Sequence, residues 1–485
     1  MVSKSPKLDI VFIPFTAPSH MMAMVDMARL VASHNVRVTI IITTHNALIF
    51  KNAIERDIKS GNAISLHVIP FPFAKVGLPE GIENLGSLTS PDQSSKVYMG
   101  TMLLQKPIEE TLRERVPDCI ISDMFYPWTT DFAAELGIPR IYFQGSSFIA
   151  QCAVDSLVRH APHENLKSDT ETFIIPGLPD CLELTRLQLP DHFRQTKTPY
   201  GAILGVIRES ESRSYGVLMN SFQEFEPRYI DHFKKVIGRK AWAVGPASLT
   251  LSKLDKAERG PNVIVDAHEC LTWLDSKEPN SVLYVSFGSL AKFCASQLHE
   301  IASALEASNH SFIWVIANEG AGDEKWLQED GFKERMNGMI IRGWAPQVLI
   351  LEHAAIGGFM THCGWNSVLE SVILGVPMVT WPLYADQFYN EKLVTQVAKI
   401  GVGVHPEAYF SPRDEERKVV VKREEIVKAV IQVMDGGDEA VKIRERAKEL
   451  GEKAKRGVEV GGSSYNDLER FIDELIQFKT THIVV

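Results

Sequence analysis

The densest group of residues that could do chemistry lies between positions 344 and 387. In its middle, the short apolar run Gly358–Thr361 ends in a turn containing Gly364, and a helical pattern begins at once. Glycine allows a tight turn, and a helix start presents free N–H groups and a partial positive charge, which suit a phosphate. Side chains at the turn add hydrogen-bond donors, namely His362, Asn366 and Ser367.

Residues on either side of this turn match the other parts of a nucleotide. Trp344 offers a flat face for stacking a base, and the backbone of Ala345 and the amide of Gln347 can pair with the edge of that base. Glu370 lies one turn along the predicted helix. Its carboxylate has enough lone pairs to accept hydrogen bonds from both hydroxyls of a ribose.

Two polar residues close the stretch. Asp386 and Gln387 follow a strand-like run and lie where a polyhydroxylated ligand would be held. Each piece taken singly has a structural explanation, since a lone tryptophan is usually a core residue. Adjacent His362 and Cys363 do not indicate a metal, because no Cys or His cluster with ligand spacing accompanies them. The combination predicts a site for a nucleoside diphosphate that carries a sugar.

The N-terminal half contributes a second pair, His20 and Asp123. Each follows a strand-like run, and parallel strands would bring both residues to one edge of a sheet. A neutral imidazole is a suitable general base for a hydroxyl group, and a carboxylate can orient the ring and stabilise the imidazolium that forms. A histidine after a strand is more often structural, but the pairing with Asp123 favours catalysis.

Short apolar runs alternate with amphipathic stretches of helical length along the chain, which predicts an α/β protein with parallel sheets. The predicted strands are Leu8–Phe15, Val36–Thr44, Leu66–Pro70, Asp118–Ser122, Arg140–Phe143, Val282–Phe287, Phe312–Ala317, Met339–Ile341, Gly358–Thr361 and Met378–Trp381. A polar segment with Gly-Pro near both ends interrupts the alternation. We predict an N-terminal Rossmann-like domain (1–245), a linker (246–262), a C-terminal Rossmann-like domain (263–460) and a C-terminal helix (461–485) that can pack back on the N-terminal domain. The site is expected in the cleft between the two doubly wound domains.

Composition excludes several classes of protein. The chain has 485 residues, a net charge of −10 and no dense basic run, so a nucleic-acid partner is not expected. Six isolated cysteines suit a reduced, cytoplasmic protein. The longest stretch without Asp, Glu, Lys or Arg contains histidine, glycine and asparagine, so no membrane span is expected. Nothing in the sequence demands more than a monomer.

Residues 344–387 resemble the signature box of plant family 1 UDP-dependent glycosyltransferases. The likeness extends from Pro-Phe-Thr-Ala-Pro-Ser-His near the start to Gly-Gly-Ser-Ser near the end. The family implies a GT-B fold, in which two facing Rossmann-like domains enclose a cleft and the C-terminal domain binds most of the donor. One departure is Ser19, which replaces the glycine that many members have before the catalytic histidine.

The resemblance also implies roles for individual residues. His20 would be the catalytic base and Asp123 its partner. The donor would be held at the uracil by Trp344, Ala345 and Gln347, at the ribose by Glu370, at the diphosphate by Ser289, His362, Asn366 and Ser367, and at the sugar by Trp365, Asp386 and Gln387. Trp365 and the final Gln387 are the choices typical of glucose users. UDP-glucose is therefore the expected donor, and an inverting transfer to a β-glucoside is the expected reaction.

The acceptor is expected to be a small hydrophobic molecule bound by the N-terminal domain, with Phe125, Phe148 and Leu189 as pocket residues. Several segments resemble the branch that glycosylates saponins, which favours a triterpenoid or steroidal aglycone or saponin. A flavonoid or another phenol is the alternative. No Asp-x-Asp pair occurs, so neither a metal nor another cofactor is expected.

Other classes of function remain as hypotheses. A sugar-nucleotide epimerase and a non-catalytic UDP-sugar-binding protein are both disfavoured, because His20 and Asp123 are present together. A nicotinamide oxidoreductase is disfavoured because the first strand is followed by Pro-Phe-Thr-Ala-Pro-Ser-His and not by the glycine-rich turn of a dinucleotide site.

Overall fold

The computed structural model describes residues 8–482, apart from 91, 196–197, 261–266, 292, 317–331 and 411–420. The two ends of the chain, the last residue of the predicted strand Phe312–Ala317 and the last two residues of the predicted linker lie outside the described residues. The strands are β1 (Asp9–Ile13), β2 (Arg37–Thr43), β3 (Ile64–Ile69), β4 (Cys119–Asp123), β5 (Arg140–Gln144), β6 (Thr172–Ile174), β7 (Glu183–Thr185), β8 (Gly216–Met219), β9 (Ala241–Ala243), β10 (Val282–Ser286), β11 (Ser311–Ile316), β12 (Gly338–Arg342), β13 (Ile356–Thr361), β14 (Met378–Thr380) and β15 (Gly401–Gly403).

The α-helices are α1 (Pro18–Ala32), α2 (Thr44–Lys59), α3 (Phe73–Val76), α4 (Gln93–Met102), α5 (Gln105–Glu114), α6 (Thr129–Glu135), α7 (Phe148–His160), α8 (Asp191–Arg194), α9 (Pro199–Arg213), α10 (Pro227–His232), α11 (Lys253–Glu258), α12 (Ala267–Asp275), α13 (Ala295–Ala307), α15 (Phe332–Arg335), α16 (Gln347–Leu351), α17 (Trp365–Ile373), α18 (Gln387–Lys392), α19 (Arg423–Met434), α20 (Asp438–Val458) and α21 (Ser463–His482). Shorter helical turns are η1 (Pro162–Asn165), η2 (Arg186–Gln188), η3 (Phe233–Ile237), η4 (Ala247–Thr250) and η5 (Leu393–Val397).

Among the described residues, the N-terminal half forms a seven-stranded sheet in the order β3-β2-β1-β4-β5-β8-β9. All of its pairings are parallel. The strand order reverses between β1 and β4, and the loops at such a switch point diverge and open a crevice beyond the carboxyl ends of the strands. His20 follows β1 and Asp123 ends β4, so both lie at this crevice.

The C-terminal half repeats the arrangement. Its described strands form a six-stranded parallel sheet in the order β12-β11-β10-β13-β14-β15, with the reversal between β10 and β13. Ser289 follows β10, and His362 follows β13. The predicted fold class, two doubly wound Rossmann-like domains, is confirmed. His20 and Asp123 lie at the switch point of the N-terminal sheet, and Ser289 and His362 lie at that of the C-terminal sheet.

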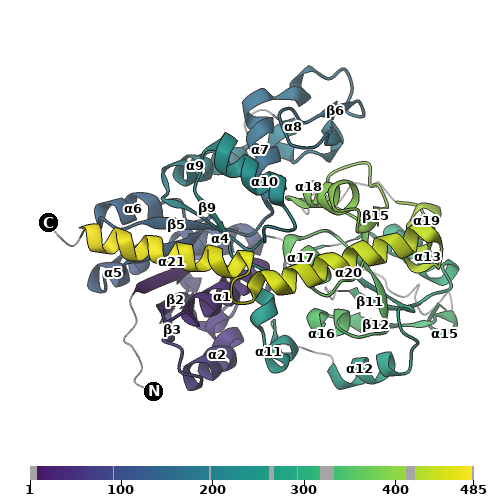
Figure 1. The fold of residues 1–485 in the computed structure, drawn as a ribbon, viewed down its shortest axis with the longest axis horizontal. Helices are drawn as coiled ribbons and strands as arrows, with labels where there is room; N and C mark the ends of the chain where they lie inside the picture. Colours follow the sequence, from purple (N-terminus) through teal and green to yellow (C-terminus); the bar gives the residue numbers. More distant parts are fainter. Residues whose placement is uncertain are drawn as a thin grey trace.

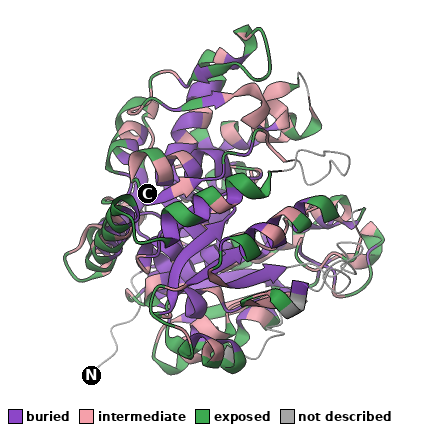
Figure 2. Cartoon of the chain, turned by 90° about the vertical axis from the view of Figure 1, so that its right-hand side faces the viewer, coloured by how far each residue is buried: buried purple, intermediate pink, exposed green. Residues whose placement is uncertain are grey.

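The central strands are buried on both faces. Every residue of β4, β5, β10 and β13 is buried, and Figure 2 shows buried strands in purple at the centre of the molecule. A strand covered on both faces gains from apolar residues at every position, which is why these strands are mostly apolar in the sequence.

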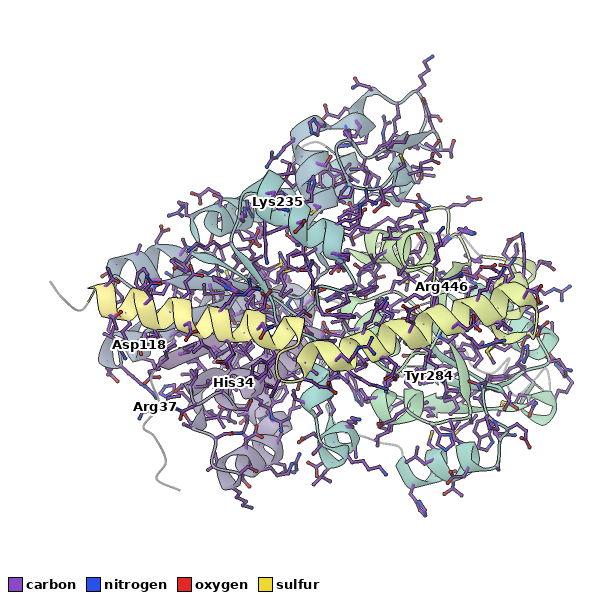
Figure 3. The ribbon with its side chains drawn as sticks, viewed as in Figure 1. His34, Arg37, Asp118, Lys235, Tyr284 and Arg446 are labelled. Carbon is purple, nitrogen blue, oxygen red and sulfur yellow. The ribbon has the colours of Figure 1, made fainter. Side chains whose placement is uncertain are left out.

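Two long helices at the end of the chain span both halves (Figure 1), with α20 along the C-terminal half and α21 along the N-terminal half. Phe471 of α21 joins the core of the N-terminal sheet, and Asp467 accepts a hydrogen bond from the main-chain N–H of Ala243 at 3.0 Å. Lys479 donates to Asp118 at 2.8 Å, and Figure 3 shows Asp118 beside this helix. Within the described residues, none of the helices is both long and apolar enough to serve as a membrane span.

The segment between the two halves is folded and bound to both. Asp255 of α11 accepts hydrogen bonds from Arg56 (Nη2–Oδ1 2.6 Å) and Arg29 (Nη2–Oδ2 3.1 Å) of the N-terminal half. Lys256 donates to Glu352 of the C-terminal half at 3.0 Å. This part of the chain is therefore packed against both domains and is not an extended loop.

Candidate active site

His20 and Asp123 form a hydrogen-bonded pair at the crevice of the N-terminal sheet. His20 lies in the first turn of α1, which Pro18 begins, and its Nδ1 is 2.8 Å from Oδ2 of Asp123. The other carboxylate oxygen accepts the N–H of Phe125 at 3.1 Å. Because an ionised carboxylate is an acceptor, the proton of the neutral ring lies on Nδ1 and the lone pair on Nε2. His20 can therefore accept a proton at Nε2.

The charge of Asp123 determines the basicity of His20. Burial, the largest single influence, lowers the pKa of His20, but the charge and hydrogen bond of Asp123 raise it, and so does Asp386 from the C-terminal half. The net result is a pKa above the ordinary value of 6.5. The ring centroid lies 5.7 Å from those of Phe15 and Phe125, which confine the imidazole. A confined imidazole with a raised pKa is a competent general base near neutral pH.

The turn before α17 forms the predicted phosphate site. Gly364 is the N-cap of α17, and a Cβ atom there would lie 2.5 Å from Nε2 of His362, so any larger residue would displace that ring. Burial lowers the pKa of His362 to about 4. The ring is therefore neutral at pH 7 and can donate one hydrogen bond. Together with the N–H groups and positive dipole end of α17, it suits an anion.

The carboxylate of Glu370 is held from two sides. Nε2 of Gln347 donates to Oε2 of Glu370 at 2.7 Å and to Oγ of Ser367 at 3.1 Å. Arg259, which follows α11, pairs with the other oxygen of Glu370 and with Asp26 of α1 (Nη2–Oδ2 2.6 Å). Glu370, which is predicted to bind the ribose, is thus connected to the N-terminal half through Arg259. The sequence analysis did not single out this arginine.

Trp344 lies against the end of the same segment. Its Nε1 donates to the carbonyl oxygen of Arg259 at 2.8 Å. Gly260 approaches the indole so closely that a Cβ atom would lie 2.2 Å from the ring, and its φ of +114° also requires glycine. Ala345, the neighbour of Trp344, is buried. The Nε1 side of the indole therefore lies against residues 259–260.

The three residues predicted to contact a sugar differ in environment. Asp386 is the N-cap of α18, and burial raises its pKa to about 6, although a hydrogen bond from Asn390 opposes this shift. Gln387 uses its side-chain oxygen to accept the N–H groups of Leu383 and Tyr384, both at 2.9 Å. Asp386 and Gln387 are thus neighbours at the start of α18. Ser289, which was predicted at the diphosphate and not at the sugar, is half-buried in the loop after β10.

The side chain of Trp365 contacts the opposite domain. Its ring stacks on Phe225 with an interplanar angle of 5° and a centroid distance of 5.7 Å, and its Nε1 donates to the carbonyl oxygen of Asn220 at 2.8 Å. The indole is 3% exposed. A sugar would therefore meet Trp365 through its main-chain N–H in the first turn of α17.

Asn366 connects the two halves of the site. Its Nδ2 donates to the carbonyl oxygen of Ser19 at 2.9 Å, and Ser19 directly precedes His20. The start of α17 is thereby held against the start of α1. The structure brings the predicted base and the predicted phosphate site together, although 347 positions separate Ser19 from Asn366.

The three predicted acceptor residues lie in different places. Phe125 is partly buried, with its ring 4.4 Å from Phe15 and beside His20. Phe148 and Leu189 have no exposed surface and belong to a core cluster, where Phe148 packs on Phe233 at 5.4 Å. Phe125 thus borders the base, whereas the other two are core residues in this structure.

Comparison with known proteins identifies the family to which the chain belongs. Residues 264–408 match the family model described as UDP-glucoronosyl and UDP-glucosyl transferase. Over 477 residues the chain is 49% identical to UDP-glucose flavonoid 3-O-glucosyltransferase 7 of Fragaria ananassa, covering 97% of this chain and 96% of the relative. The chain belongs to this family. Soyasapogenol B glucuronide galactosyltransferase of Glycine max is a similar UDP-glycosyltransferase, 48% identical over 99% of this chain and 98% of its own length.

Solved structures of UDP-glycosyltransferases have the same fold. Glycyrrhiza uralensis UGT73P12, complexed with glycyrrhetinic acid 3-O-monoglucuronide, matches with a TM-score of 0.92 and 47% identity over 98% of this chain and 97% of its own. Medicago truncatula UGT71G1, complexed with UDP-glucose, matches with a TM-score of 0.76 and 26% identity over 98% and 99%. The predicted family resemblance and the GT-B fold are confirmed. The protein is therefore an enzyme, as predicted, and specifically a UDP-glycosyltransferase.

Proposed function

We propose that this enzyme is an inverting O-glucosyltransferase that uses UDP-glucose. The hydrogen bond from Asn366 to Ser19 carries the proposal, since it joins the anion-binding start of α17 to the base on α1. A donor whose diphosphate lies at α17 has its anomeric carbon within the region between His20 and Asp386. These two groups face each other closely enough for Asp386 to raise the pKa of His20.

The mechanism is a single displacement. His20 takes the acceptor hydroxyl proton on Nε2 while the acceptor oxygen forms a bond to the anomeric carbon. The bond from that carbon to the diphosphate oxygen breaks, and UDP leaves with the electron pair. Attack opposite the leaving group converts the α-linked donor into a β-glucoside. Asp123 stabilises the imidazolium, and the start of α17 with neutral His362 stabilises the charge that develops on the diphosphate.

In this proposal the donor is bound along the C-terminal crevice. Uracil stacks on the face of Trp344 away from Gly260, flanked by Ala345 and Gln347, and the ribose hydroxyls bind Glu370. Ser289, Asn366 and Ser367 contact the diphosphate. Asp386, Gln387 and the main chain of Trp365 contact glucose. The buried environment of Gln387 and the partly buried one of Asp386 support their role, because hydrogen bonds to a sugar are strongest where water is excluded.

The acceptor is a triterpenoid or steroidal aglycone or saponin. The relatives support this choice, because one is named for soyasapogenol B glucuronide, one for nuatigenin, and one was solved with a glycyrrhetinic acid glucuronide. A flavonoid or another phenol is the second candidate, favoured by the flavonoid 3-O-glucosyltransferase of Fragaria ananassa. The apolar ring of Phe125 beside His20 suits either aglycone. We also propose that the enzyme works as a cytoplasmic monomer without a metal.

A two-panel assay tests the function. Purified enzyme is given UDP-glucose with either saponin-type or flavonoid acceptors, UDP release is measured, and products are identified by mass and by the anomeric coupling in NMR. The expected product is a β-glucoside of a triterpenoid or steroid. Turnover confined to flavonoids would select the second candidate. His20→Ala is expected to lose about 100-fold or more in rate while UDP-glucose still binds, and near-normal turnover would remove His20 from the mechanism.

A further inference from the structure

Asn390 lies at the point where the two domains meet. It belongs to α18 of the C-terminal domain and has no exposed surface. Its Oδ1 accepts a hydrogen bond from Oγ of Ser147 at 2.5 Å, and Ser147 is the N-cap of α7 in the N-terminal domain. Its Nδ2 donates to the carbonyl oxygen of Cys363 at 2.9 Å and to Oδ2 of Asp386 at 3.0 Å. One amide therefore contacts three functional segments.

The hydrogen-bond partners fix the orientation of this amide. Oγ of Ser147 accepts the N–H of Ala150 at 3.2 Å, and its own proton points to Asn390. The Asn390 oxygen must therefore face α7. Its nitrogen then faces Cys363 and Asp386, whose atoms at this point are both acceptors. A rotated amide would turn its oxygen toward two acceptors and lose the bonds to Cys363 and Asp386, so this orientation of the buried amide is what holds Asp386.

The contact with Asp386 has a chemical consequence. A buried carboxylate tends to take up a proton, and burial raises the pKa of Asp386 to about 6, whereas the hydrogen bond from Asn390 lowers it. A donor that favours the ionised form keeps the carboxylate available as an acceptor for hydroxyl groups. The same bond restrains the rotation of the carboxylate, because the oxygen of the Asn390 amide is held by Ser147 of the opposite domain.

We propose that Asn390 is a positioning residue that orients Asp386 toward the sugar of the donor, and that Ser147 couples this orientation to the contact between the domains. The inference rests on the proposed function, which gives Asp386 its sugar. It goes beyond that function by assigning roles to two residues that touch no substrate. It also connects the binding of the sugar by Asp386 to the N-terminal domain, where the acceptor is expected to bind.

A double-mutant cycle tests whether Asn390 acts through Asp386. The variants are Asn390→Ala, Asp386→Ala and the pair together, and the measured quantities are kcat and KM for UDP-glucose, the Kd of UDP by calorimetry, and Tm. A hydrogen bond to a charged group contributes enough for a change of roughly 10-fold or more in kcat/KM. We expect that loss in Asn390→Ala and no further loss when it is added to Asp386→Ala.

Binding of UDP separates positioning from a general structural effect. The Cys363 turn has a second support, because its N–H donates to Oγ1 of Thr361 at 3.3 Å. We therefore expect the Kd of UDP to change by less than about threefold. A parallel loss of UDP affinity and kcat/KM would overturn the proposal, and so would independent, multiplying losses in the double variant. If Asn390→Ala does not fold, the isosteric Asn390→Asp takes its place under the same criteria.

Ser147 tests the link between the domains. Ser147→Ala is expected to lower kcat/KM for UDP-glucose about threefold to tenfold, the range for a neutral hydrogen bond, and Ser147→Thr is expected to restore it. Ser156→Ala is the matched control, because Ser156 is a buried serine of the same helix whose hydroxyl donates to Pro176 at 2.6 Å, away from Asn390. Equal losses in the Ser147 and Ser156 variants would overturn the coupling.

The outcome is distinguishable from failure of the proposed function. The wild-type enzyme alone tests the donor, and if it turns over another UDP-sugar, the variants are compared on that sugar. Turnover by wild type with unchanged kinetics in Asn390→Ala would overturn this inference and leave the proposed function intact.

Discussion

Replacing Asp123 by asparagine tests the base, because its two carboxylate oxygens have different N–H partners. Oδ2 faces Nδ1 of His20 at 2.8 Å, and Oδ1 faces the N–H of Phe125 at 3.1 Å. Asparagine offers one oxygen. If that oxygen stays on Phe125, the amide NH2 faces Nδ1 and moves the ring proton to Nε2, the atom that must accept the proton of the substrate. If the amide rotates, two N–H groups oppose each other.

The expected loss follows from the role of the base. Asp123 has no exposed surface, so water cannot replace the missing acceptor. We expect kcat to fall about 100- to 10,000-fold, the range of general base catalysis, which corresponds to about 2.7–5.4 kcal/mol in activation free energy. The Kd of UDP-glucose should stay within about twofold, since the proposed donor site lies in the other domain. The assay is UDP release at saturating acceptor, with calorimetry for the donor.

The pH profile gives a second measurement on the same variant. In wild type the pKa of His20 is raised above its ordinary value, and the reaction needs the neutral ring, so kcat/KM should fall as the pH decreases through that pKa. Asn at position 123 removes the charge that raises it, and the acid limb of the residual activity should move to lower pH. Asp131→Asn is the control, because Asp131 is an exposed residue of α6. A rate within fivefold of wild type with an unmoved acid limb would refute the reasoning.

Three further outcomes are expected. Gly364→Ala should weaken UDP binding roughly 10-fold or more, measured by calorimetry, because the added Cβ displaces His362; unchanged affinity would argue against a phosphate site there. Arg259→Leu should cost about 3–5 kcal/mol of folding free energy, because it leaves the carboxylates of Asp26 and Glu370 buried without their cation, and an unchanged Tm would contradict this. Turnover should survive removal of divalent cations by a chelator, and recovery on adding Mg²⁺ would show a metal requirement.

The sequence predicted the sheets well where strands are long and buried. The run Val36–Thr44 contains β2, and Val282–Phe287 contains β10, because a strand covered by helices on both faces is apolar throughout. The short strands β8 and β9 were not predicted. They have four and three residues and leave only a weak pattern, although the equally short β14 was predicted within the run Met378–Trp381. The small antiparallel pair of β6 and β7 was missed for the same reason.

The candidate site was predicted in its parts but not in its connections. Glycine turns, helix starts and acid–base pairs leave local patterns, which is how His20 and His362 were found. Arg259 leaves none, since it is one charged residue in a polar segment, and its importance comes from Asp26 and Glu370, which lie far from it in the sequence. Trp365 shows the reverse, because its position was recognised while the contact of its indole with the other domain was not.

The folded linker matters for anyone who builds hybrid enzymes from two members of the family. Asp255 forms ion pairs with two arginines of the N-terminal half, and Lys256 forms an ion pair with a glutamate of the C-terminal half. In a chimera that exchanges one half at this junction, Asp255 or Lys256 loses its partner unless the paired residues are taken from the same parent. To combine the donor preference of one enzyme with the acceptor preference of another, the crossover point should therefore be placed so that these ion pairs are kept, and not simply in the shortest loop.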